Sequence, residues 1–180
     1  LLISVKNLEE SRIARYAKAD VIDLKDPSVG ALGALGVDVV SQIVQDVSGG
    51  VLLSATVGEG HATIDVLKQD IVLYAGLGVD VVKIAVSGLF ELADFYSEIK
   101  QLTNLGIKLV AVIFANEPLD FSLLNKLKDG GFYGAILDTK LKKTSLLDLQ
   151  TTKTLQKFTV VCKQHMLISG LAGSINMTHV

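Results

Sequence analysis

The stretch DVIDLKDPSVGALGALG, from Asp20 to Gly36, decides how the rest of the chain is interpreted. It begins with the apolar run VIDL, which is typical of a buried parallel strand, and that run ends at Lys25. Asp-Pro follows directly, and then Gly30 and Gly33 among small residues, which favours a tight loop that can approach a ligand closely. Because side chains alternate along a strand, Asp23 and Lys25 are expected to project from one face where the strand meets its loop.

Strand and helix patterns alternate along the whole chain outward from this stretch. Nearly unbroken apolar runs predict strands, and apolar residues at helical spacing predict helices between them. The expected strands cover 1–5, 21–24, 51–60, 79–88, 108–116, 134–138 and 166–175, and the expected helices cover 6–19, 37–47, 64–77, 88–105, 120–127 and 146–158. Alternation of this kind indicates a parallel sheet with crossover helices, either a closed barrel or an open doubly wound sheet.

A TIM-type (β/α)8 barrel is the preferred fold class because polar residues recur at the carboxyl ends of many predicted strands. A closed barrel aims all strand ends at one pocket, whereas an open sheet gathers ligands at a switch point. The polar strand ends are Lys25, Thr56, Lys83, Asn116, Asp138 and Ser174. We expect residues 1–180 to form one barrel domain, truncated at the carboxyl end, in which the eighth strand and the final helix are missing.

Composition narrows the possible functions. The chain has 180 residues, 49% of them hydrophobic, and a net charge of -2, so no nucleic acid or anionic membrane is expected as a partner. One cysteine, Cys162, excludes a disulfide framework and indicates a small core residue in a reducing, cytoplasmic setting. One cysteine and three scattered histidines give no zinc-type ligand spacing, and no apolar run is long enough for a transmembrane segment.

Lysines and carboxylates at the strand ends predict chemistry on carbonyl groups. A desolvated lysine loses its proton more readily, and the free amine can attack a carbonyl to form a Schiff base. Lys25, Lys83 and Lys142 are candidates for such amines, and Asp23 and Asp138 supply carboxylates that could move protons or hold an ammonium group. This set of residues suits an aldolase-like condensation and dehydration.

Glycine-rich loops predict where a phosphate group would bind. Gly30 and Gly33, and the run Ala172, Gly173 and Ser174, offer backbone N–H groups, and barrels often bind phosphate after their last strands. A small molecule that carries a phosphate group is therefore the expected partner.

Each of these residues could instead have a purely structural role. A lysine at a strand end is more often solvated, although Lys25 and Lys83 are flanked by apolar runs that favour a functional role. Gly30 and Gly33 could serve the turn alone. Lys140 and Lys143 flank Lys142, and the sequence hardly separates the three.

The motif ADVIDLKDPSVGALGA closely resembles the first signature of the (5-formylfuran-3-yl)methyl phosphate synthases, TIM-barrel enzymes of methanofuran biosynthesis. The resemblance continues through SATVGE, DVVKIAVSG, AILDTKLKK with TSLLDL, and LAGSI, in the family's order. It implies a lyase that condenses two molecules of glyceraldehyde 3-phosphate to a furan aldehyde phosphate, with no metal and no organic cofactor. Both methanogens and methylotrophic bacteria use such pathways, and the sequence does not choose between them.

The resemblance also implies a role for each matching residue. By position, Lys25 corresponds to the Schiff-base lysine and Lys83 to the proton acceptor. Asp23, Asp138 and Lys142 correspond to further charges of the active site, and Lys142 stands four residues beyond Asp138 in the LDT-x-x-K pattern. The segment that follows AGSI in the family, with its eighth strand, is expected to be missing here.

Two other functions remain open at this stage. Another Schiff-base aldolase acting on a different sugar phosphate would use the same lysines, and a truncated barrel could be a non-catalytic subunit. Barrels of this class often self-associate, and an unfilled eighth position would expose strand edges, so we expect a homo-oligomer.

Overall fold

A computed structural model describes residues 1–47, 49–116, 118–140 and 144–175. The chain divides into two compact units. The first comprises Leu1–Ala85 with Leu105–Lys108, and the second comprises Val86–Asn104 with Leu109–Val180. Each unit is built from parallel strands joined by helices, so the predicted α/β architecture is confirmed. A closed eight-stranded barrel and a single domain over 1–180 stay predictions.

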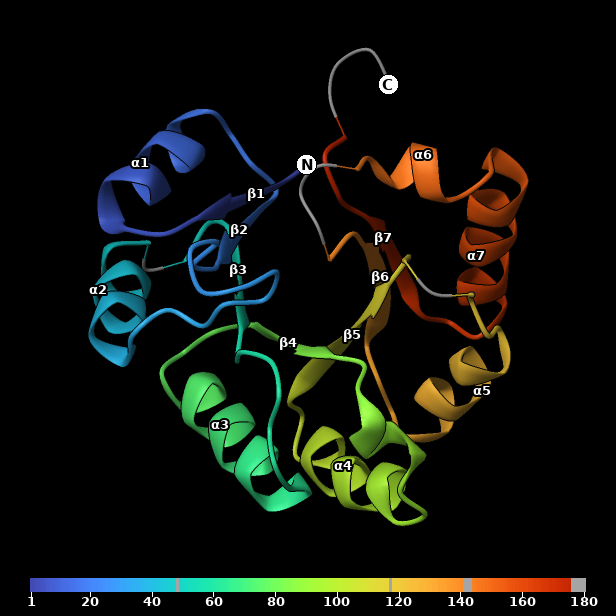
Figure 1. Ribbon diagram of the computed structural model, residues 1–180. Helices are drawn as coiled ribbons and strands as arrows, with labels where there is room; N and C mark the ends of the chain where they lie inside the picture. The colour runs from blue at the N-terminus through green and yellow to red at the C-terminus, as the bar shows by residue number, and fades with distance from the viewer. Residues whose placement is uncertain (48, 117, 141–143, 176–180) are drawn as a thin grey trace. The chain divides into compact units, whose positions relative to one another are not determined.

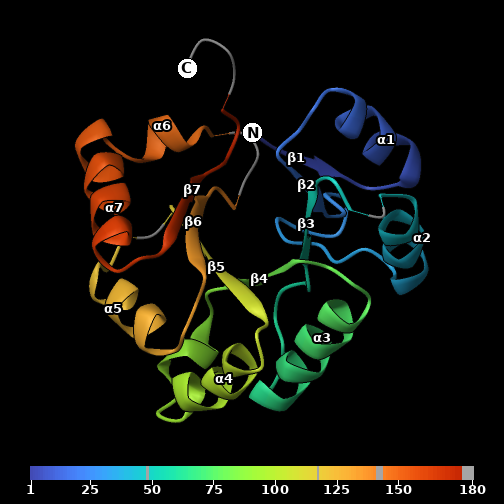
Figure 2. The same ribbon diagram turned by 180° about the vertical axis from the view of Figure 1, so that it is seen from behind.

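The first unit is a parallel sheet whose strands follow one another in chain order. Its strands are β1 (Leu2–Val5), β2 (Val21–Leu24), β3 (Leu52–Thr56) and β4 (Val81–Ala85), and its helices are α1 (Leu8–Tyr16), α2 (Val37–Val47) and α3 (Ile64–Gly76). The three helices cover one face of this sheet (Figures 1 and 2). Single crossover helices between neighbouring parallel strands produce this layering.

The second unit repeats this arrangement. It contains the strands β5 (Lys108–Phe114), β6 (Gly134–Asp138) and β7 (Ile168–Leu171), paired in that order, with a 3-10 turn η1 (Gly88–Glu91) and the helices α4 (Phe95–Asn104), α5 (Ser122–Asp129), α6 (Leu146–Leu149) and α7 (Thr152–Gln164). Its core contains an aromatic cluster in which the rings of Phe90 and Phe95 lie 4.2 Å apart, centroid to centroid.

Two predicted helices are interrupted in the structure. The expected helix over 88–105 is broken at Leu92, whose extended backbone (φ -70°, ψ 137°) separates η1 from α4. The expected helix over 146–158 is broken at Gln150, which is also extended. Thr151 then begins α7 as its N-cap, because its hydroxyl accepts a hydrogen bond from the Thr154 N–H at 3.1 Å. At Gln150, local capping by Thr151 therefore overrides an apolar pattern that would fit one continuous helix.

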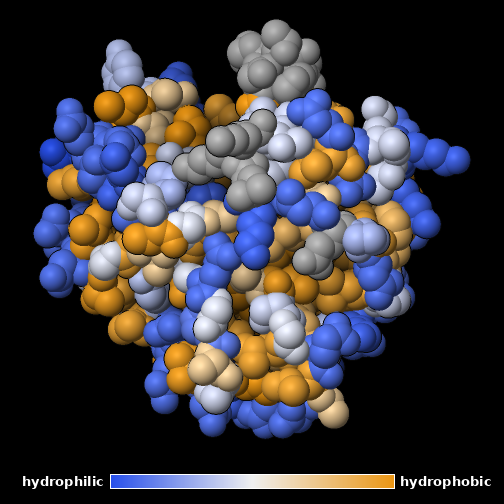
Figure 3. Space-filling view, viewed as in Figure 1, coloured by the Kyte–Doolittle hydropathy of each residue, from blue (hydrophilic) through white to orange (hydrophobic). Residues whose placement is uncertain are grey.

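The surface seen in Figure 3 intersperses hydrophobic and hydrophilic residues. Exposed large hydrophobic side chains include Tyr16 and Met166, while the strand and helix residues that face the cores of the two units are buried. Within the described residues, no helix has both the length and the apolar character needed to cross a lipid bilayer.

Alkaline pH is expected to destabilise the second unit. Burial raises the pKa of the Cys162 thiol in α7 from 9.0 to about 11, and burial together with the charge of Glu91 raises the pKa of Tyr96 in α4 to about 12. Below pH 9 both groups are protonated in the folded and the unfolded chain, so neither group lowers the free energy of unfolding there. As pH rises from 9 towards 11, the unfolded chain releases the Cys162 proton first, and stability falls.

Urea unfolding at a series of pH values from 8 to 11 measures this effect. The midpoint should stay level up to about pH 9 and then fall. Cys162→Ala is expected to flatten the fall between pH 9 and 11, whatever it does to the absolute midpoint. If the midpoint of that variant fell with pH as steeply as that of the unaltered protein, Cys162 would not be the cause of the fall.

Candidate functional site

A row of polar residues crosses three strands of the first unit. In the register of the sheet, Ser4 of β1 pairs with Asp23 of β2, and Asp23 pairs with Ser54 of β3. Paired residues of parallel strands project from the same face. The two serine side chains therefore flank the carboxylate of Asp23 from either side.

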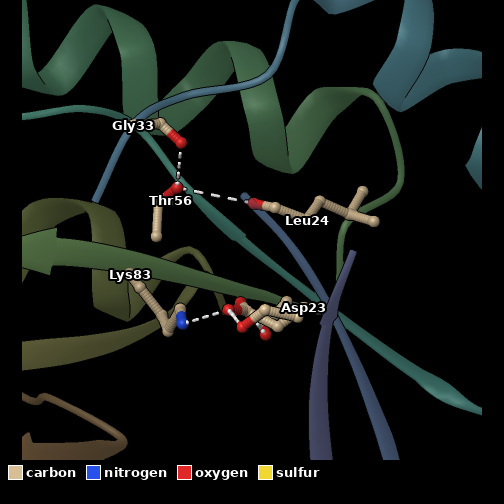
Figure 4. Close-up of polar contacts among 7 residues, drawn as sticks. Asp23, Leu24, Gly33, Thr56 and Lys83 are labelled. Atoms are coloured by element: carbon tan, nitrogen blue, oxygen red, sulfur yellow. Dashed lines mark hydrogen bonds and ion pairs between the residues drawn. The ribbon is translucent and has the colours of Figure 1, made fainter. Parts of the chain in front are cut away.

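The Asp23 carboxylate accepts hydrogen bonds from three described side chains. Lys83 Nζ and Ser4 Oγ donate to Oδ2 at 2.7 Å and 2.9 Å, and Ser54 Oγ donates to Oδ1 at 2.6 Å. Figure 4 shows Lys83 reaching from β4 toward Asp23. Asp23 is completely buried and Lys83 is 5% exposed. Since a buried charge is tolerated when it is paired and hydrogen-bonded, these residues form a satisfied polar cluster inside an otherwise apolar sheet.

Lys25 occupies the carboxyl end of β2. Its backbone N–H donates to the Val5 carbonyl at 3.0 Å, so strand pairing continues one residue beyond the strand itself. The side chain is half-buried, unlike that of Lys83. Because Lys25 stands two residues beyond Asp23, alternation puts the two side chains on the same face of the strand. Lys25 therefore lies on the face of the sheet that carries Asp23 and Lys83, where β2 ends.

The loop after β2 is fastened to the end of β3. The Gly33 carbonyl accepts hydrogen bonds from the Thr56 hydroxyl and from the Asp26 N–H, both at 2.9 Å, and the first of these is visible in Figure 4. Glu59 Oε1 accepts a hydrogen bond from the Leu32 N–H at 2.9 Å. Gly30 has φ +140°, a conformation that favours glycine. The loop that follows Lys25 thus has a fixed shape.

Gly33→Ala is expected to destabilise the protein by about 3 kcal/mol, because overpacking that cannot relax is costly. A Cβ at Gly33 would lie 2.1 Å from the Asp26 carbonyl oxygen, which is backbone. Gly76→Ala at the end of α3 is the matched control, since its Cβ would meet nothing within 4 Å. Urea unfolding should show a clear loss of stability for Gly33→Ala and none for Gly76→Ala. Equal unfolding midpoints for the two variants would contradict the tight packing at Gly33.

The other predicted site residues that are described lie in the second unit. Asp138 ends β6 and is buried; its Oδ1 accepts the Thr139 N–H at 2.7 Å. Ala172, Gly173 and Ser174 follow β7, and Gly173 has φ +111° and packs against Thr139 so closely that a Cβ would lie 2.5 Å from its methyl group.

Lys142 and Lys143 lie outside the described residues. Lys140 is described and exposed, and its Nζ lies 5.7 Å from the centroid of the Phe114 ring. The choice among these three lysines therefore stays open.

Reasoning from the sequence missed the residues that hold the site together. Ser4, Ser54 and Glu59 are not chemically unusual in the sequence, and their partners are 19, 31 and 27 residues away. The alternation of polar residues within the first and third strands was the available signal. It becomes informative only when the register of the strands is known.

Metal binding finds no support in the part of the chain that the structure describes. No group of three or more histidine, cysteine, aspartate or glutamate residues there could hold an ion. His61 Nε2 instead lies 3.1 Å from Asp70 Oδ2, within the first unit. A lysine amine, a buried carboxylate–ammonium pair and serine hydroxyls are suited to attack a carbonyl and to move protons.

Sequence comparison identifies proteins to which this chain is similar. A family model described as 4-HFC-P synthase matches residues 1–180. A protein of Methylorubrum extorquens, provisionally named (5-formylfuran-3-yl)methyl phosphate synthase, is 38% identical over 178 residues, which cover 98% of this chain and 73% of that protein. The (5-formylfuran-3-yl)methyl phosphate synthase of Methanococcus aeolicus is 32% identical, with 100% of this chain and 82% of that protein covered.

Solved structures agree in fold. 3-Keto-L-gulonate-6-phosphate decarboxylase from Vibrio cholerae aligns with a TM-score of 0.69 and 15% identity, over 97% of this chain and 78% of that chain. 2,3-Dimethylmalate lyase aligns with a TM-score of 0.65 and 11% identity, over 97% and 75% of the two chains. At such identities the likeness shows only the fold, which is TIM-barrel-like. The match over the whole chain and the identity to the M. extorquens protein show the family: the chain belongs to the 4-HFC-P synthases, that is, to the (5-formylfuran-3-yl)methyl phosphate synthase family.

Proposed function

We propose that this chain condenses two molecules of glyceraldehyde 3-phosphate to (5-formylfuran-3-yl)methyl phosphate through a Schiff base on Lys25, as a step of methanofuran-type cofactor biosynthesis. The observation that carries the proposal is the cluster at the end of β2. There the half-buried Lys25 follows, by two residues, a buried carboxylate that is paired with the ammonium group of Lys83. Membership of the (5-formylfuran-3-yl)methyl phosphate synthase family supports this choice of product.

The first step forms the covalent intermediate. The Lys25 amine adds to the carbonyl carbon of one triose phosphate, and loss of water gives an iminium ion. The positive nitrogen withdraws electrons from the neighbouring carbon, so that its C–H bond becomes acidic.

The Asp23–Lys83 pair serves the second step. Lys83 rests as an ammonium group, so it first gives a proton to the hydroxyl group that leaves as water in the first step. The amine so formed then takes the proton from that carbon, and the electron pair of the C–H bond becomes the double bond of an enamine. The Nζ atom that carries this proton lies 2.7 Å from the Asp23 carboxylate. The buried carboxylate therefore stabilises the charge that the proton transfer creates.

The remaining steps balance without a further reagent. A new carbon–carbon bond joins the enamine to the second triose phosphate, one phosphate leaves as its C–O bond breaks, ring closure and dehydration follow, and hydrolysis of the iminium returns Lys25. Two triose phosphates thus give one furan phosphate, one inorganic phosphate and two waters. No oxidation or reduction takes place overall, and aromaticity favours the last steps.

Trapping of the intermediate tests this proposal. The purified protein is incubated with glyceraldehyde 3-phosphate and borohydride, and peptide mass spectrometry locates any reduced adduct, while furan absorbance is followed in a parallel sample without borohydride. An adduct on Lys25 together with a furan chromophore supports the proposal. An adduct without the chromophore indicates an aldolase for another sugar phosphate, and no adduct on any lysine of a folded sample would overturn catalysis by this chain.

A further inference from the structure

Two hydroxyl groups hold the carboxylate on which the proposed proton transfer depends. Ser4 and Ser54 stand opposite Asp23 on the two neighbouring strands, and each donates to a different carboxylate oxygen. Ser54 is 2% exposed, so its hydrogen bond at 2.6 Å is made out of contact with solvent. A carboxylate that accepts donors at both oxygens is restricted in rotation about its terminal bond.

The position of the Lys83 ammonium group depends on this carboxylate. A lysine side chain is a long flexible stem with a point charge at its end, so its nitrogen is positioned mainly by its partner. Lys83 Nζ donates to Oδ2, the oxygen that Ser4 also contacts, while Ser54 secures Oδ1. A rotation of the carboxylate would shift Oδ2, and the nitrogen of Lys83 would follow.

The third hydroxyl of this region, that of Thr56, has a different role. Thr56 pairs with Lys83 in the register, yet its Oγ1 donates to the Gly33 carbonyl at 2.9 Å and lies 3.4 Å from the Leu24 carbonyl. It fastens the loop after β2. The hydroxyl contacts of Asp23 among the described residues are therefore those of Ser4 and Ser54.

We propose that Ser54 and Ser4 are positioning residues for proton transfer: they fix the plane of the Asp23 carboxylate and thereby hold Lys83 Nζ where it accepts the substrate proton. This inference rests on the proposed function. Neither serine forms or breaks a covalent bond in the proposed reaction. Loss of Ser54 should therefore slow the proton transfer and leave Schiff-base formation on Lys25 in place.

Four variants separate positioning from general destabilisation. Ser54→Ala and Ser4→Ala delete the two hydroxyls, and Ser4→Thr retains a hydroxyl at a position where the side chain is exposed enough to accept a methyl group. Ser11→Ala is the matched control, because Ser11 of α1 is equally buried and its hydroxyl has no hydrogen-bond partner among the described residues. It deletes the same atom from the same unit without touching Asp23.

Turnover is the first readout. Ser54→Ala is expected to lower kcat roughly tenfold or more with little change in KM, since a hydrogen bond to a charged group acting on one step is lost. The yield of the borohydride-trapped adduct on Lys25 should stay within about twofold of the unaltered protein, because only a step after Schiff-base formation is affected. Ser4→Ala should show a smaller fall in kcat that Ser4→Thr restores, and Ser11→Ala should show none.

A second readout needs no substrate. A short pulse of an amine-acylating reagent, followed by peptide mass spectrometry, measures how often the Lys83 amine is released from its partner. Ser54→Ala should raise Lys83 labelling several-fold over Ser11→Ala, with exposed lysines as internal references. If the unaltered protein makes no furan, the proposed function fails, yet this readout still decides whether Ser54 holds the pair. Lys83 labelling in Ser54→Ala that equals the Ser11→Ala level, or an unchanged kcat, would overturn the inference.

Discussion

Lys25→Ala is expected to abolish the formation of furan product, with a fall in kcat of at least about a thousandfold, because the covalent intermediate can no longer form. The side chain of Lys25 is half-buried at the end of β2, and the strand contact with Val5 is made by the backbone N–H of Lys25, which the substitution keeps. The fold should therefore survive the substitution. Furan absorbance measures the activity, and urea unfolding verifies that the variant is folded.

The controls for Lys25→Ala distinguish covalent catalysis from a general charge effect. Lys100→Ala removes an exposed lysine from α4 and should leave activity unchanged. Lys25→Arg keeps the positive charge but cannot form the Schiff base, so it should be as inactive as the alanine variant. Activity above a tenth of the original in Lys25→Arg, or a borohydride adduct on another lysine, would show that Lys25 is not the nucleophile.

Breaking the pair between Asp23 and Lys83 is expected to have the largest effect on stability. Lys83→Met leaves the carboxylate buried without its cation, and the loss of one partner of a buried ion pair costs about 3 to 5 kcal/mol. Asp23→Asn leaves the Lys83 ammonium group beside a neutral amide and should cost a similar amount. Both groups are nearly inaccessible to solvent, so water screens the remaining unpaired charge only weakly.

A double-mutant cycle tests whether the pair acts as a unit. The variant with both substitutions should lose less free energy of unfolding than the sum of the two single losses, by roughly 1 to 3 kcal/mol. The exposed pair between Arg12 and Asp46 provides the comparison, and its cycle should give a much smaller coupling. Additive losses for Asp23 and Lys83 would mean that the two side chains do not stabilise each other despite their separation of 2.7 Å.

Much of the fold follows from local patterns in the sequence. The apolar runs predicted all the strands that the structure describes, and the helix over Val37–Val47 begins and ends where its pattern predicted. Cys162 is a buried core residue, as predicted. These features depend on side-chain periodicity within one element, which a sequence displays directly. The break at Gln150 was not predicted, because the capping residue Thr151 competes with an apolar stripe that continues past it. The break at Leu92 was not predicted either.

The charged residues of the candidate site were visible in the sequence because charge inside an apolar run is unusual. Lys25, Lys83 and Asp23 stood out for that reason, and their motifs also indicated the family to which the chain belongs. Which of them touch one another was not visible. The structure joins Asp23 to Lys83, 60 residues later in the chain, through the packing of β2, β3 and β4 in register.

The sequence by itself determined the strands and their order, most of the helices, the family, and the candidate lysines and carboxylates of the site. Only the tertiary structure decided that Ser4 and Ser54 hold Asp23, and that Thr56 and Glu59 hold the loop after Lys25. The reason is physical: a strand's own periodicity gives the face on which a side chain lies, whereas its neighbour depends on the register between strands. That register is fixed by the packing of residues far apart in the chain.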